Sequence, residues 1–163
     1  MNAAIDTIEA PRPCRGEPAL ARVTAAGNTL LTGVRQLFVA DSDQASGVTE
    51  RLLEQYGGYC EALFEQLATD APTELMDLVR FAGLRPAKLT YAAEALGSTG
   101  RAEAVSILIE ILSSHPSALV REGAIFGVLK ASTTSARPTL ERLALSDPSA
   151  AVREAASSAL ELI

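Results

Sequence analysis

The chain is poor in the side chains that enzymes and metal sites use most, since its 163 residues include one histidine, two cysteines and no tryptophan. His115 stands beside Pro116 at an expected helix start, so it is expected to cap a helix or lie exposed rather than to catalyse a reaction. Cys14 and Cys60 are far apart in sequence and form neither a metal-ligand pair nor a disulfide framework. We therefore expect free thiols and no catalytic residue, metal or cofactor.

The sequence also lacks a long apolar run. No stretch approaches the roughly 20 apolar residues that a membrane-spanning helix needs. The first residues include Asp6 and Glu9 rather than a basic segment followed by an apolar one. Arginine outnumbers lysine twelve to two, which hints at a GC-rich bacterial genome. These patterns predict a bacterial, cytoplasmic protein that does not enter a membrane.

What the chain does have is an internal repeat. Residues 116–124 recur 32 positions later as residues 148–156. The same shift aligns small residues with small ones, as in Ala92, Ala124 and Ala156, and large residues with large ones, as in Leu108 and Leu140. Units of this length bury their apolar faces by stacking on one another, so the repeat predicts a solenoid.

Each unit is predicted to contain two antiparallel helices. Apolar residues recur at intervals of three and four within each half, and turn residues separate the halves, at Gly97 and Gly100 in one unit and over residues 132–135 in the next. Asp147 with Pro148 favours a helix start, and the last helix is expected over 149–163. The fold class is therefore predicted to be all-α.

At these residues the sequence resembles the HEAT-repeat family, in particular its short bacterial form. Asp147, Val152 and Arg153 match the family in spacing over residues 86–163. The resemblance implies a right-handed α-solenoid, in which an Asp and an Arg form a ladder between neighbouring units. By this resemblance Arg121 reaches Asp147 across an interface, and Arg153 occupies the same position in the last unit.

The sequence also departs from the family pattern. His115 stands where the family has Asp, and Lys88 and Leu89 stand where the valine and arginine are expected, so the ladder is expected to be incomplete.

The N-terminal half is expected to differ from the repeats. Residues 1–18 are rich in proline and predict a flexible arm. Residues 19–85 predict a helical region, although Gly27 with Asn28 leaves a hairpin open as an alternative. Its end suggests a degenerate repeat, because residues 60, 63 and 64 are larger than their equivalents 92, 95 and 96.

Charge is concentrated in the middle of the chain. Residues 41–77 hold nine carboxylates against one arginine, Arg51. Such a segment repels phosphate backbones, which disfavours nucleic-acid binding, and it attracts a basic protein. The simplest alternative is an ordinary solvated helix face. The candidate partner contacts in this segment are Glu50, Glu54, Tyr56, Glu61 and Glu65.

The apolar residues at the end of the last helix, Leu160, Leu162 and Ile163, form a second candidate surface. They either complete the core or leave an edge for another chain, including a second copy of this one.

The leading interpretation is a non-catalytic protein-interaction module that binds a basic partner, in the manner of an immunity protein, an adaptor or a scaffold. The alternative is an enzyme subunit of the bilin-lyase type, which rests only on the HEAT resemblance, because some relatives with short HEAT repeats attach bilins.

Overall fold

The computed structural model describes residues 60–81 and 83–163. Within these residues the chain is all-helical and contains no strand, which confirms the predicted fold class. The helices are α3 (Cys60–Asp70), α4 (Pro72–Phe81), α5 (Pro86–Leu96), the 3-10 helix η2 (Gly97–Thr99), α6 (Ala102–Ser114), α7 (Ala118–Ala131), α8 (Arg137–Ser146) and α9 (Ala150–Leu160). The predicted arm, the open choice between helix and hairpin, and the candidate contacts Glu50, Glu54 and Tyr56 lie outside the described residues.

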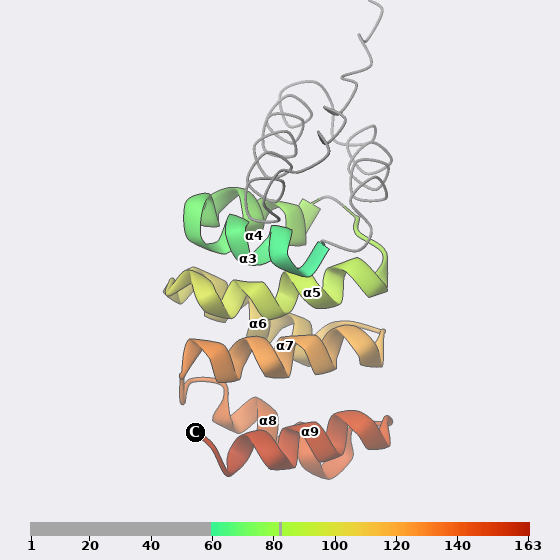
Figure 1. Cartoon of the computed structure of the whole chain (residues 1–163). Helices are drawn as coiled ribbons and strands as arrows, with labels where there is room; N and C mark the ends of the chain where they lie inside the picture. The colour runs from blue at the N-terminus through green and yellow to red at the C-terminus, as the bar shows by residue number, and fades with distance from the viewer. Residues whose placement is uncertain (1–59, 82) are drawn as a thin grey trace, which may run out of the picture.

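The helices form two rows. One row contains α3, α5, α7 and α9, in which each helix packs on the next, and the other contains α4, α6 and α8 (Figure 1). Each helix of the second row follows its partner in the first row through a short connection, so consecutive helices form hairpins. The repeat of 32 residues is thus one hairpin, and the chain is a stack of such hairpins, as a solenoid requires.

The connections follow the local sequence. Pro72 begins α4 and Pro86 begins α5, where a missing backbone N–H costs no helical hydrogen bond. The hairpin of α5 and α6 turns at Gly100, whose φ of 64° lies in the left-handed region that glycine adopts without steric cost. The next hairpin turns at Ser132, which has a φ of 49°. The predicted turns at both places are confirmed.

The last helix is shorter than the predicted span of 149–163. Asp147 accepts a hydrogen bond at Oδ1 from the Ser149 N–H at 2.8 Å, which leaves Ser149 extended as the N-cap, so α9 begins at Ala150. At the other end the Arg137 guanidinium donates to the main-chain oxygens of Leu160 and Ile163. The tail therefore leaves the helix and is held against α8.

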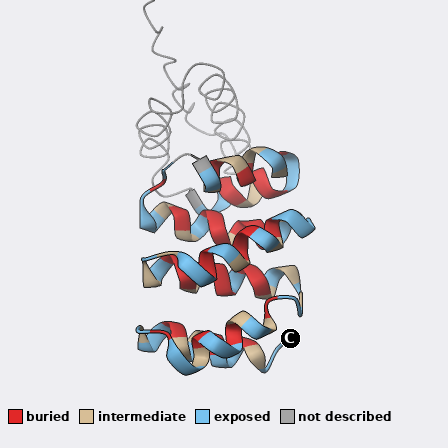
Figure 2. Ribbon diagram, turned by 180° about the vertical axis from the view of Figure 1, so that it is seen from behind, coloured by how far each residue is buried: buried red, intermediate tan, exposed pale blue. Residues whose placement is uncertain are grey.

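The apolar core lies between the two rows and extends through the height of the stack (Figure 2). The aligned alanines Ala92, Ala124 and Ala156 are all fully buried, which is the outcome that the repeat register predicts. The largest fully buried side chains come from both rows; they are Leu63, Phe64, Leu67, Leu75, Leu78, Leu96, Ile107, Leu108, Leu112 and Ile125. Burial of this surface is the main source of the stability of the stack.

The α3–α4 hairpin lies where the sequence suggests a fourth, degenerate unit. It packs on α5 as α5 packs on α7, and Leu63 and Phe64 are fully buried where α5 has Ala95 and Leu96. A leucine in place of Ala95 needs more room between α3 and its neighbours than an alanine does.

Helices α5 and α7 make the tightest contact of the stack, because glycines bring the backbones together. A Cβ added to Gly97 would lie 2.0 Å from the Gly127 carbonyl oxygen, and one added to Gly127 would lie 2.6 Å from the Ala93 oxygen. A Cβ at Gly123 would lie 2.7 Å from the Thr90 oxygen. These three positions therefore require glycine for the observed separation of the two helices.

Candidate functional site

A buried ion pair joins the last two units. The Arg121 guanidinium donates to both carboxylate oxygens of Asp147, from Nε to Oδ2 and from Nη2 to Oδ1, each at 2.8 Å. Arg121 Nη1 also donates to the main-chain oxygens of His115 at 2.7 Å and Pro116 at 3.1 Å. The two side chains are only 9% and 2% exposed, so this bidentate pair is a structural link rather than a free binding group.

The environment of Asp147 sets its protonation. Burial alone would raise the pKa of its carboxyl, but the hydrogen bonds from Arg121 and from the Ser149 amide, together with the arginine charge, lower the pKa below its ordinary value. A carboxyl whose pKa is lower in the folded state stabilises the fold above its unfolded pKa. That contribution is lost as the pH falls through the lowered value.

Arg153 repeats half of this arrangement at the end of the stack. Its Nη1 donates to the main-chain oxygens of Asp147 at 2.6 Å and Pro148 at 3.3 Å, as Arg121 Nη1 donates to His115 and Pro116. Within the described residues no carboxylate bonds its other nitrogens.

The upstream interface has different chemistry at the same positions. Leu89 takes the place of Arg121 and is buried, and His115 takes the place of Asp147. His115 Nδ1 accepts a hydrogen bond from the Ser117 N–H at 3.2 Å, which matches the bond from Ser149 to Asp147. The histidine thus replaces the capping function of the aspartate but not its charge.

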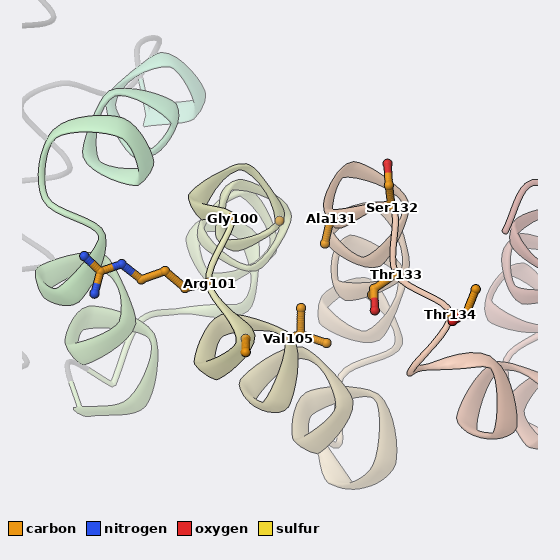
Figure 3. A pocket seen from close by; sticks show the side chains of 9 residues that line it. Gly100, Arg101, Val105, Ala131, Ser132, Thr133 and Thr134 are labelled. Carbon is orange, nitrogen blue, oxygen red and sulfur yellow. The ribbon is translucent and has the colours of Figure 1, made fainter.

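A hollow of about 340 Å³ lies between two neighbouring turns of the stack, over Gly100 to Val105 on one side and Ala131 to Thr134 on the other. The Arg101 side chain points away from the hollow (Figure 3). Among the lining hydroxyls, that of Ser132 donates to the Leu129 main-chain oxygen and that of Thr133 accepts from the Ser135 N–H, so both serve the turn itself. The hollow therefore offers few groups that converge on a ligand.

The carboxylates predicted to bind a partner differ in their surroundings. Glu61 is exposed on α3. Glu65 accepts a hydrogen bond from Lys130 Nζ at 2.5 Å, and Glu94 pairs with the same ammonium at 2.9 Å. Lys130 thus connects α3, α5 and α7. Burial acts to lower the pKa of Lys130, but the two glutamates outweigh it and raise that pKa.

Helix α4 adds an acidic cluster on the other row. The pKa of Asp77 is raised, first because its carboxyl is partly desolvated and then because Glu74 and Glu103 repel its charge. Arg80 opposes this shift, although it also donates to Glu103 at 2.8 Å. Helices α3 and α4 together carry five carboxylates and a single arginine. The N-terminal hairpin is therefore the acidic part of the described stack.

The three apolar residues of the predicted C-terminal edge have different positions. Leu160 and Ile163 pack against the core, whereas Leu162 is 74% exposed. Ser157 of α9 and Glu161, which directly follows α9, are exposed at the positions that hold the buried Ile125 and the half-buried Leu129 in α7. The face of α9 that would receive another unit is therefore polar.

Sequence reasoning missed one surface. Tyr91, Leu119 and Phe126 are large, apolar and between 43% and 48% exposed, on α5 and α7. The repeat register contains the signal, because the equivalents of these residues in neighbouring units are small or polar, with the exception of Tyr59 at the position of Tyr91. Helical periodicity alone could not separate them from core residues.

Residues 60–81 and 83–163 contain no helix with both the length and the apolarity needed to span a bilayer. In the same residues, histidine, cysteine, aspartate and glutamate nowhere gather in a group of three or more suited to a metal ion.

Comparison with known families confirms the resemblance inferred from the sequence. Residues 84–161 match the family model described as HEAT repeats. The match covers α5 to α9 and leaves α3 and α4 outside, in agreement with the larger core side chains of that hairpin. Searches of curated proteins and of solved structures found no match.

Proposed function

We propose that this chain is a non-catalytic protein-interaction module that binds a basic protein partner. The observation that carries the proposal is the combination of a rigid helical stack, matched to HEAT repeats over residues 84–161, with an excess of carboxylates on its N-terminal hairpin. Stacked helices present a surface that is already ordered, so binding costs little conformational entropy. The carboxylates attract a cationic surface and raise the association rate.

The described contacts in this proposal are Glu61 and Glu65. An inhibitor of a basic protein and an adaptor both fit this description, and the bacterial cytoplasm stays a prediction from composition.

The proposal is tested by capture on the immobilised full chain from a lysate of the cells that express it, followed by measurement of the affinity of the purified partner. The affinity should fall steeply with salt, because raising the ionic strength from about 0.01 M to about 0.15 M shortens the screening length from roughly 30 Å to roughly 8 Å. Reversing two exposed carboxylates, in the variant Glu61→Lys with Asp70→Lys, should weaken binding at least about tenfold.

A matched control applies the same charge change at the far end of the stack, in Glu154→Lys with Glu161→Lys, where both side chains are also exposed. This variant should bind as the unmodified chain does. A partner of acidic or neutral surface, or equal losses in the two variants, would rule the proposal out.

A further inference from the structure

The outward face of α5 and α7 presents a compact apolar patch, defined here as Tyr91, Leu119 and Phe126. Glu94 and Lys130 form an ion pair between the two helices at 2.9 Å. Tyr91 lies one turn before Glu94, and Phe126 lies one turn before Lys130, so the two aromatic side chains share this face of the neighbouring helices. Leu119 lies two turns before Phe126 and extends the patch along α7.

The fold does not need these side chains to be large and apolar. In the repeat register the equivalents of Tyr91 in the two later units are Gly123 and Ala155, although the upstream unit has Tyr59, and those of Phe126 are Ala62, Glu94 and Ser158. Leu119 likewise corresponds to alanines at 87 and 151. Aromatic residues make up only 4% of the chain, and yet Tyr91 and Phe126 are 43% and 44% exposed. Exposed aromatic side chains that packing does not require are typical of binding surfaces.

Carboxylates surround the patch. Glu65 and Glu94 lie at one end, in contact with Lys130, and Glu61 lies one turn before Glu65 on α3. On α7, Glu122 lies between Leu119 and Phe126. The nearby cations Lys88 and Lys130 already have interaction partners within the chain. The carboxylates around the patch thus leave negative charge that can attract a cationic ligand.

We propose that this patch is the docking site for a basic amphipathic helix of the partner, whose apolar side chains contact Tyr91 and Phe126 while its lysine or arginine residues pair with Glu61 and Glu122. The inference rests on the proposed function and specifies its binding face and the class of segment bound. Apolar anchors on the aromatic pair supply most of the affinity, because well-packed aromatic residues dominate interface energies. Arginine or lysine placed over either ring adds a cation–π contribution.

The experiment titrates the isotope-labelled full chain with two synthetic probe peptides and follows the amide resonances by NMR. The first peptide is a helix of about four turns with leucine on one face and lysine on the other. The second replaces every lysine by glutamate. The lysine peptide should shift resonances of α5 and α7 around the patch, and the glutamate peptide should leave them unchanged.

Two variants provide the quantitative test. Tyr91→Ala with Phe126→Ser installs the residues found at the equivalent positions of the last unit, so the fold should be retained, and affinity for the lysine peptide should fall at least about tenfold. Leu145→Ser removes an apolar side chain that is 85% exposed on α8, in the other row, and should not change affinity.

The outcomes separate this inference from the proposed function. Shifts confined to α4, α6 or α8, or an affinity that the Tyr91 and Phe126 substitutions do not change, would overturn the docking site and leave the binding of a basic partner intact. Equal binding of the two peptides, or no binding of the lysine peptide, would also overturn it. Failure of the proposed function is seen separately, in the charge of the captured partner.

Discussion

At the scale of single residues, an interface with a buried ion pair has an upstream equivalent that lacks one. Between the last two units Arg121 and Asp147 form a buried bidentate pair, whereas one unit earlier the same positions hold Leu89 and His115. Both solutions fill the space and both provide an acceptor for a free amide near a helix start. The difference is that the charged solution depends on both of its members being present.

Asp147→Asn is expected to destabilise the chain by about 3 kcal/mol, because it leaves the buried Arg121 guanidinium without a compensating charge. Urea unfolding measures this change. The double variant Arg121→Leu with Asp147→His installs the upstream pair and is expected to lose less stability than Asp147→Asn alone. A double variant that loses more than the single one would show that the two interfaces are not interchangeable.

Asp77→Asn is expected to raise the Tm near neutral pH by about 1–2 °C. The folded pKa of Asp77 is raised, so its charged form is disfavoured in the folded state, and this penalty disappears as the pH falls through the raised pKa. Thermal melts near neutral pH and near pH ~3 should therefore show the gain only at the higher pH. Glu110→Gln, which removes an exposed carboxylate on α6, serves as the control and should change the Tm little at either pH.

At the scale of helices, the contact between α5 and α7 determines how closely the two central units stack. Gly97, Gly123 and Gly127 each lie against a backbone oxygen of the opposite helix. A backbone oxygen cannot rotate away as a side chain can, so a larger residue must separate the helices.

Gly97→Ala is expected to destabilise the chain by about 1–3 kcal/mol, even though alanine is the better helix former. The added methyl group would meet the Gly127 oxygen at 2.0 Å, and this clash outweighs the gain of roughly 1 kcal/mol in helix propensity. Ser98→Ala, at the exposed neighbouring position, is the control. Chemical unfolding of both variants tests the expectation, which fails if Gly97→Ala is neutral or stabilising.

The helices show how far sequence reasoning reached. Gly100 and residues 132–135 marked the turns correctly, because the left-handed backbone of such turns favours few residue types. The start of α9 was placed one residue early, since the choice between Ser149 and Ala150 depends on which amide the Asp147 carboxylate accepts from. The end was placed three residues late, because the bonds from Arg137 that hold the tail come from a different helix.

At the scale of the whole molecule, each helix packs mainly on the helices next to it in the stack, both within its own row and across to the other row. Stability in such a stack is close to a sum over neighbouring interfaces, so damage to one interface should remain local. The buried Arg121–Asp147 pair lies at the interface between α7 and the last unit.

Hydrogen exchange should therefore show that Asp147→Asn lowers amide protection in α8 and α9 more than in α5 and α6. The measurement compares protection factors in the variant and in the unmodified chain, with Leu145→Ser as a surface control on α8. A uniform loss over all helices would indicate that the stack unfolds as a single cooperative unit.

The proposed binding surface was less accessible from the sequence than the fold. The repeat identified the stacked hairpins because every unit must bury the same face, whereas the proposed surface depends on positions at which one unit departs from others. Phe126 is such a departure, as is Tyr91 from the later units, and both become visible only when the register is combined with exposure. The charge excess at Glu61 and Glu65 could be read from sequence, whereas the contact of Glu65 with Lys130 could not.

The Lys130 contacts to Glu65 and Glu94 have a mechanical consequence, because a single ammonium ties three successive helices of one row. Flexing the stack so that this side lengthens would stretch the tie, whereas the opposite flexure would leave it slack. Each of these exposed ion pairs contributes only about 0.2–1 kcal/mol of stability. Together they therefore favour one direction of bending without making the stack rigid. The part of the stack from α3 to α7 should consequently bend more easily in one direction than in the other, and this difference should shrink at high ionic strength.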